Sequence, residues 1–177
     1  MWVRNLIYRQ RHDEGQSLLE TAVAMPLLLG IAFNLINLGY FWFVVLSLAA
    51  APRQGVQYSA QGGASLATAS APSATAVSNL VFDNMTNAVH GASTANTGVR
   101  VCMGTNPATG VANCTPFGDM SISFSAVAGD PEAPVFALNR VDVGYRVTPV
   151  IPGTAFNVVL PTTPIIFRRH VSMRSLY

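Results

Sequence analysis

The stretch that decides the fold is Thr21–Ala51, TAVAMPLLLGIAFNLINLGYFWFVVLSLAAA, which contains no Asp, Glu, Lys, Arg or His. A helix of this length spans roughly 46 Å at ~1.5 Å per residue, whereas the hydrocarbon core of a bilayer needs only about 20 residues. The stretch therefore predicts a helix that crosses a membrane and continues beyond it. Tyr40 and Trp42 are expected near the membrane interface, where amphipathic rings are favoured.

The rest of the composition narrows the class of protein. The chain has 177 residues, of which 50% are hydrophobic and 10% are charged, against about 25% charged residues in average globular proteins. Ten arginines and no lysine leave a net charge of +2, too small and too scattered for a nucleic-acid groove. The sequence contains no GxSxG, HExxH, CxxC or phosphate-loop motif, so we expect no enzyme and no cofactor or metal site.

The charges that flank the apolar stretch predict its orientation. Arg4, Arg9 and Arg11 precede it, and only Arg53 follows before Arg100. Because arginines stay on the cytoplasmic side, the N-terminus is expected in the cytoplasm and the C-terminal part across the membrane. The small residues at Ala49–Ala51 are similar to a signal-peptide cleavage site, but the apolar region of a signal peptide is only ~7–15 residues long.

The junction before the apolar stretch carries the most specific motif. A short charged leader ends in Gly15, Gln16 follows, and a single acid, Glu20, stands before the apolar run. This pattern resembles the class III signal of type IV pilin-like proteins. The resemblance implies that a prepilin peptidase cuts after Gly15 on the cytoplasmic side, so that Gln16 becomes the first residue of the mature chain and Glu20 the fifth.

The chemistry of the junction is consistent with such a cut. Gly15 has no side chain, so the backbone there can lie extended in a narrow peptidase cleft. Cleavage leaves the apolar helix on the protein and creates a cationic amine at its head. A carboxylate at the centre of a membrane helix costs about +2.5–3.5 kcal/mol on insertion scales, so Glu20 needs a partner. In the pilin-like arrangement that partner is the N-terminal amine of a neighbouring subunit. The alternative is an interfacial acid that the helix macrodipole favours by ~0.3–1 kcal/mol.

Further residues narrow the resemblance to the TadE-like pseudopilins. They are Gly15, Glu20, Pro26 with the following Leu27-Leu28-Leu29-Gly30, Leu38-Gly39-Tyr40, and the Ala-rich segment AAAPRQGVQYSA at 49–60. The family usually has Phe where this chain has Thr21, and Pro52 interrupts the Ala-rich segment.

The resemblance implies a minor pilin or pseudopilin of a type IVc (tight-adherence, Flp-type) pilus, with roles in surface adhesion and biofilm formation. The protein would be a single-pass protein of the bacterial inner membrane, with a cytoplasmic N-terminus and a periplasmic C-terminal domain. Its partners would be the membrane, the prepilin peptidase, other pilin or pseudopilin subunits and the pilus assembly platform. Whether the protein enters the filament, caps it or only assists its assembly stays open.

The other interpretation is an uncleaved, membrane-anchored periplasmic interaction module. Thr21 and the acids Asp13 and Glu14 beside the proposed cleavage site favour it.

Polar and small residues inside the apolar stretch predict a packing face. Asn34 and Asn37 share a helix face, and Gly30 on the same side permits close approach. Asparagine side chains that hydrogen-bond to a neighbouring helix stabilise helix pairs in membranes, so we expect a contact face here. The alternative is that these side chains lie against protein or water within this chain. Pro26 removes one backbone donor and clashes with the carbonyl of Ala22, which predicts a kink.

The remaining chain predicts a small α+β domain, that is, a long N-terminal helix followed by a shorter helix and an antiparallel sheet of three to five strands. The expected organisation is a leader at 1–15, a transmembrane helix at 16–51, a helix extension and linker at 52–72, and the domain at 73–177. Apolar periodicity predicts a helix over 73–90 and strands over 99–103, 120–126, 141–148 and 165–173. In the last strand Arg168, Arg169 and Arg174 discourage further pairing at a sheet edge; alternatively they form a basic docking patch for phospholipid or a partner.

Cys102 and Cys114 are the only cysteines of the chain. In an oxidising exported compartment they are expected to form a disulfide, which would contribute roughly 3 kcal/mol in the chain-entropy model. Two reduced structural thiols are the alternative.

Overall fold

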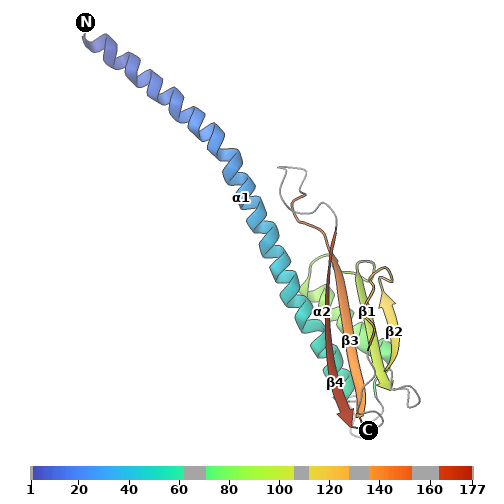
Figure 1. Ribbon diagram of the computed structural model, residues 1–177. Coiled ribbons are helices and arrows are strands. Elements are labelled where there is room, and N and C mark those ends of the chain that lie inside the picture. Colours follow the sequence, from blue (N-terminus) through green and yellow to red (C-terminus); the bar gives the residue numbers. More distant parts are fainter. Residues whose placement is uncertain (1, 62–70, 106–111, 128–135, 153–163, 177) are drawn as a thin grey trace. The chain divides into compact units, whose positions relative to one another are not determined.

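The structure is a computed structural model that describes residues 2–61, 71–105, 112–127, 136–152 and 164–176. Two helices, α1 (Trp2–Gln61) and α2 (Ala74–Ala88), precede four strands: β1 (Thr97–Thr105), β2 (Ala112–Gly118), β3 (Phe136–Val147) and β4 (Ile165–Leu176) (Figure 1). The predicted α+β class is confirmed, as are the extension of the long helix beyond residue 51 and the shorter helix near 73–90. The linker expected before residue 73 lies largely outside the described residues.

The chain divides into two compact units. One comprises Met1–Tyr40 with Pro149–Thr162, and the other comprises Phe41–Thr148 with Thr163–Tyr177. The division falls between Tyr40 and Phe41, inside the segment 16–51 that the sequence predicts as one transmembrane helix. The two parts of α1 differ in burial, and the difference explains the division.

In the first unit, α1 exposes large apolar side chains on all sides as far as Leu29, and beyond Leu29 one side is covered, where Asn37 is buried. The residues Leu18, Leu19, Val23, Met25, Leu27, Leu28, Ile31, Leu35 and Ile36 are each more than half exposed. A helix that is apolar all round belongs in lipid or inside a larger assembly. Within the described chain, α1 over Gln16–Gln61 is long and apolar enough to cross a membrane.

In the second unit, α1 packs along one face. Its buried residues recur every three or four positions and so form one stripe: Phe41, Val44, Leu48, Ala51, Gly55 and Ser59. This spacing follows the 3.6-residue helical repeat. The apolar stretch of the sequence therefore contains a part that is exposed all round, as far as Leu29, and a part beyond it that is covered along one face.

Helix α2 begins at a conventional cap. The hydroxyl of Ser73 accepts a hydrogen bond from the N–H of Ala76 at 3.1 Å, which satisfies one of the unpaired donors of the first turn. Val77, Val81 and Met85 follow at four-residue intervals and are fully buried. Helix α2 thus covers the sheet with one apolar face.

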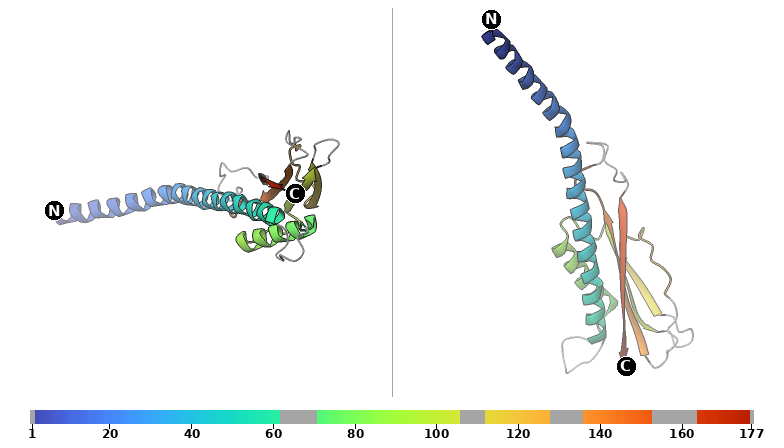
Figure 2. Two further views of the ribbon diagram at one scale, coloured as in Figure 1. Left: turned by 90° about the horizontal axis from the view of Figure 1, so that it is seen from below. Right: turned by 60° about the vertical axis from the view of Figure 1, so that its left-hand side comes forward.

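The four strands form one antiparallel sheet in the order β2-β1-β3-β4. Directly paired residues share a face of the sheet. One face carries a fully buried row that consists of Val99, Val101, Val141, Val143 and Val147. Both helices lie on this side of the sheet (Figure 2). Gly55 of α1 lies within contact distance of Val81 of α2 and Val141 of β3, so the valine row and the two helices share one core.

The segment 120–126, predicted as a half-buried strand, is not a strand in the structure. The side chain of Asp119 accepts hydrogen bonds from the N–H and the hydroxyl of Ser121, and the N–H of Ile122 donates to the carbonyl of Asp119. This turn breaks the extended conformation at the start of the segment. The prediction failed because Ile122 and Phe124 pack onto a sheet face without pairing in a ladder, and Met120 is exposed.

The segment 120–126 packs on the sheet face opposite the helices, at a notch that two paired glycines form. Gly98 and Gly144 are directly paired across β1 and β3, and Ile122, which is 3% exposed, lies over both. A Cβ on Gly144 would come within 2.5 Å of Cγ2 of Ile122, and a Cβ on Gly98 within 3.2 Å of its Cβ. The absence of side chains at both glycines therefore makes room for Ile122.

The other three predicted strands are confirmed as β1, β3 and β4, with β4 at the sheet edge as expected. Strand β2 was not predicted, because its sequence ANCTPFG shows no apolar alternation and contains Pro116. Proline is tolerated in edge strands, and β2 is the other edge of this sheet.

Candidate functional site

The proposed cleavage point lies inside a continuous helix. Both Gly15 and Gln16 belong to α1, and Gln16 is exposed. The extended conformation expected in a peptidase cleft is therefore not the one in the structure. Glycine inside a helix is destabilising by roughly 0.5–1 kcal/mol relative to alanine, so Gly15 is a point at which the helix unwinds at relatively low cost.

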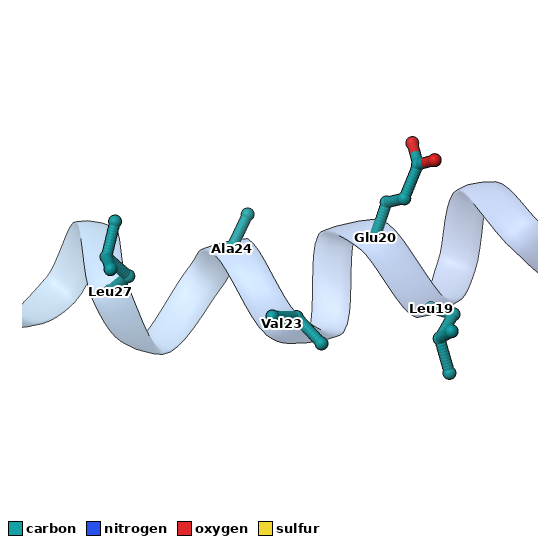
Figure 3. A pocket seen from close by; sticks show the side chains of 5 residues that line it. All are labelled: Leu19, Glu20, Val23, Ala24 and Leu27. Carbon is teal, nitrogen blue, oxygen red and sulfur yellow. The ribbon is translucent and has the colours of Figure 1, made fainter.

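Glu20 stands on the exposed apolar part of α1. Figure 3 shows its carboxylate extending away from the helix axis on the same side as Ala24 and Leu27, whereas Leu19 points to the opposite side. Glu20 lines a shallow surface depression with Leu19, Val23, Ala24 and Leu27. Among the described side chains no ion-pair partner accompanies it. The depression offers an apolar surface with one carboxylate, which suits a neighbouring helix that carries a cation.

Helix α1 runs uninterrupted across Pro26. The kink predicted there has not been measured, so it stays a prediction. Four residues further on, Gly30 has no atom within 4 Å of the position that a Cβ would take. Its lack of a side chain is therefore not needed for any contact within the described chain.

The two asparagines of the predicted packing face have partners within the chain. The amide of Asn34 donates to the carbonyl of Gly30 at 2.8 Å on the same helix. Asn37, only 1% exposed, donates from Nδ2 to the carbonyl of Ile151 at 2.9 Å and accepts from the N–H of Ile151 at 3.0 Å. The alternative, in which the asparagine lies against protein of its own chain, therefore holds for Asn37.

The disulfide between Cys102 and Cys114 is confirmed, and the alternative of two free thiols is wrong for this structure. The two residues are directly paired across β1 and β2, with their Cα atoms 4.0 Å apart. Cys102 is fully buried, whereas Cys114 is exposed. The bond ties the short edge strand β2, which contains a proline, to the interior of the sheet.

Sequence reasoning missed an ion cluster on the sheet face opposite the helices. Both carboxylate oxygens of Asp142 are bound, one by Arg100 and one by Arg140, each through two guanidinium nitrogens at 2.8 and 2.9 Å. Asp142 is 2% exposed. Arg100 also donates to the carbonyl of Ser125 at 2.6 Å and lies over the ring of Phe124 at 5.2 Å.

This cluster links β1, β3 and the segment that covers them. Removing one partner of a buried ion pair typically costs about 3–5 kcal/mol, because the other charge stays buried. In the sequence, charged residues alternate with valine in two strands. This alternation predicts an ion cluster only once the strand register is known, because the register pairs Arg100 with Asp142.

A smaller ion pair fixes the turn at the start of the covering segment. The guanidinium of Arg146 lies 3.1 Å from the carboxylate of Asp119 and also donates to the hydroxyl of Ser121. Hydrogen bonds from the side chain and main chain of Ser121, together with the charge of Arg146, hold the pKa of Asp119 below its usual value.

Two further observations concern metal binding and similarity to known proteins. The residues that the structure describes contain no group of three or more His, Cys, Asp or Glu that could hold a metal ion. No family model, no curated protein and no solved structure matches the chain. The motif at the head of α1 and the exposure of that helix are therefore the features that bear on function.

Proposed function

We propose that this protein is a TadE-like minor pilin or pseudopilin of a tight-adherence (Flp-type) pilus in the bacterial inner membrane. The leader 1–15 is removed by a prepilin peptidase, and α1 then packs against other subunits. The N-terminus lies in the cytoplasm and the sheet domain in the periplasm, where it is available to the pilus assembly platform. The observation that carries the proposal is an apolar helix whose first part, residues 16–29, is exposed on all sides and is headed by the motif Gly15, Gln16, Glu20.

The exposure of α1 supports an assembling helix. Leu18 is 73% exposed and Val23 72% exposed, and the apolar surface surrounds the helix as far as Leu29 and continues on one side through Leu38. An exposed apolar surface of this extent is a site for lipid or protein partners. The same helix continues into the domain, so a subunit held by its first half carries its sheet domain along.

The position of Glu20 supports a register function. Its carboxylate lies at an exposed site among leucine, valine and alanine side chains (Figure 3). In an apolar environment an unpaired carboxylate is costly, and a cationic amine on an adjacent helix would remove that cost. Cleavage after Gly15 places such an amine on Gln16 of every subunit. Pairing between subunits would then fix the axial offset of neighbouring helices.

Processing of a substituted junction tests the proposal. Gly15→Leu places a branched side chain at the position that must fit a narrow peptidase cleft, so we expect an unprocessed precursor in the membrane fraction. Gly30→Leu, at a glycine of α1 where an added Cβ would meet no atom within 4 Å, is the matched control and should be cleaved normally. Normal processing of the Gly15→Leu chain would exclude this cleavage site.

The second candidate function is an uncleaved periplasmic interaction module anchored by α1. One structural observation favours it: the bond between Gly15 and Gln16 lies within continuous helix, and a protease cannot cut it without local unwinding. In this case wild type and Gly15→Leu would both keep Met1 at the N-terminus, and their masses would differ only by the substituted side chain.

A further inference from the structure

We propose that Arg168 and Arg169, near the start of β4, bind anionic phospholipid headgroups of the leaflet from which α1 emerges. The proposal goes beyond the pilin-like function and depends only on α1 as a membrane span. It holds whether or not the leader is cleaved.

The position of the two arginines follows from one aromatic contact. The rings of Phe41 and Phe167 meet edge to face, with their centroids 6.3 Å apart. Arg168 and Arg169 follow Phe167 directly, within about 7 Å along the strand at ~3.3 Å per residue. The start of β4 therefore lies beside the turn of α1 that begins at Phe41, and Figure 2 shows β4 running alongside this part of the helix. Along α1, the exposed large apolar side chains continue past Phe41 and end at Leu46, which is 57% exposed.

The charges of these two arginines are not neutralised within the described chain. Both side chains are exposed, and neither forms an ion pair or hydrogen bond with another described residue. By contrast, the three arginines of β1 and β3 are bound to Asp142 or Asp119. Arg168 is paired with Gly144 and Arg169 with Val143, so the two side chains project to opposite faces of the edge strand. A surface that meets this edge can reach both guanidinium groups.

Exposed aromatic side chains lie on the neighbouring helix turn. Trp42 is 67% exposed and Phe43 52% exposed, and both follow Phe41 directly. Tryptophan is enriched at the level of lipid headgroups, and basic side chains at the same level are attracted by anionic lipid. A guanidinium binds a phosphate through two parallel hydrogen bonds. Together these residues have the composition of an interfacial anchor.

A lipid surface explains this combination better than a protein strand does. Pairing of β4 with a second copy of itself would bring arginines close to one another, which is unfavourable. An acidic strand added to the edge would neutralise Arg168 and Arg169 but would leave Trp42 and Phe43 exposed. A membrane surface supplies phosphate for the arginines and an apolar boundary for the aromatic rings.

Lipid retention by the full chain tests the proposal. The protein, purified in detergent, is mixed with equal amounts of phosphatidylglycerol and phosphatidylcholine, and the lipids that remain bound are weighed by native mass spectrometry. We expect wild type to prefer phosphatidylglycerol and the double variant Arg168→Gln/Arg169→Gln to lose that preference, a change on the order of tenfold. Arg53→Gln, at an exposed arginine of α1, is the matched control and should keep the preference.

Two further measurements distinguish an effect of charge from an effect on folding, and binding of lipid from binding of free phosphate. Arg168→Lys/Arg169→Lys keeps both charges and should retain most of the preference, and circular dichroism spectra of all variants should superimpose. Soluble glycerol phosphate should not displace the lipid. The proposal is overturned if the double glutamine variant retains phosphatidylglycerol as wild type does, if Arg53→Gln loses it equally, or if glycerol phosphate displaces it.

Discussion

Asn37 binds both polar groups of the main chain of Ile151, donating to its carbonyl at 2.9 Å and accepting from its N–H at 3.0 Å. The two residues are 114 positions apart in the sequence. The carboxamide presents the same donor and acceptor as a peptide group, so it satisfies a main chain that has left the sheet after β3. An asparagine inside an apolar helix thereby fixes the position of the segment that follows the strand.

Replacing this asparagine should loosen that segment. Asn37→Leu keeps the branched shape and the number of non-hydrogen atoms of the side chain but leaves the N–H and carbonyl of Ile151 without their partner, which costs about 1–3 kcal/mol where the groups stay buried. We expect a lower melting temperature in detergent and faster hydrogen exchange at Ile151. Asn34→Leu is the control, because the amide of Asn34 reaches only the Gly30 carbonyl of its own helix. Equal effects of the two substitutions would contradict the assigned role of Asn37.

The contact of α1 with α2 predicts a penalty for adding a single methyl group. In Gly55→Ala the new Cβ would lie 2.6 Å from Cγ2 of Val81. Overpacking of this kind typically costs about 1–3 kcal/mol, against a gain in helix propensity of about 1 kcal/mol, so the free energy of unfolding should fall. Gly39→Ala, where no atom lies within 4 Å, should keep or raise it.

A double-mutant cycle isolates this contact. In a Val81→Ala background the clashing methyl group is gone, so Gly55→Ala should no longer destabilise the protein. Thermal unfolding of the four chains in one detergent gives the coupling energy. If Gly55→Ala costs the same in both backgrounds, Val81 is not the neighbour that limits space at Gly55.

The disulfide should contribute measurably to stability. Cys102→Ala/Cys114→Ala should lower the free energy of unfolding by roughly 3 kcal/mol, because the unfolded chain is no longer cross-linked. Chemical denaturation with and without a reductant measures the effect. Reductant should destabilise wild type and leave the double alanine variant unchanged. Two free thiols in protein isolated from its own host would contradict both the disulfide and the exported location.

The ion pair at the turn predicts a pH dependence with a definite sign. Because hydrogen bonds from Ser121 and the charge of Arg146 lower the pKa of Asp119 in the folded state, folding favours the deprotonated carboxylate. This contribution is fully present above the unfolded pKa of about 3.9 and is lost as the pH falls through the lower, folded value. The stability difference between wild type and Asp119→Asn should therefore shrink below about pH 4. A difference that grows on acidification would contradict the assignment.

The sequence predicts those features that depend on local patterns. The apolar run predicts α1, the spacing of Val77, Val81 and Met85 predicts α2, and the alternation around Val141 and Val143 predicts a strand. Each pattern reports which side of an element is buried, and this suffices to recognise an element and its approximate ends. The disulfide was predictable because Cys102 and Cys114 are the only candidates for each other.

Features that depend on register or on distant segments were not predictable. Ile122 and Phe124 alternate as strand residues do, yet they cover the paired glycines of β1 and β3, and only the register reveals that notch. The partner of Asn37 lies 114 residues away, so the sequence showed a costly polar group without showing what satisfies it. In the same way, Asp142 gains its two arginines only once β1 and β3 are paired.

The identity of the first residue of the mature chain tests the central claim most directly. The full-length gene is expressed in its own host, the protein is recovered from membranes and from sheared surface material, and its N-terminus is read by intact mass and terminal sequencing. The pilin-like account predicts a chain that begins at Gln16 and keeps all of the apolar helix. A chain that still begins at Met1 in both fractions would contradict it.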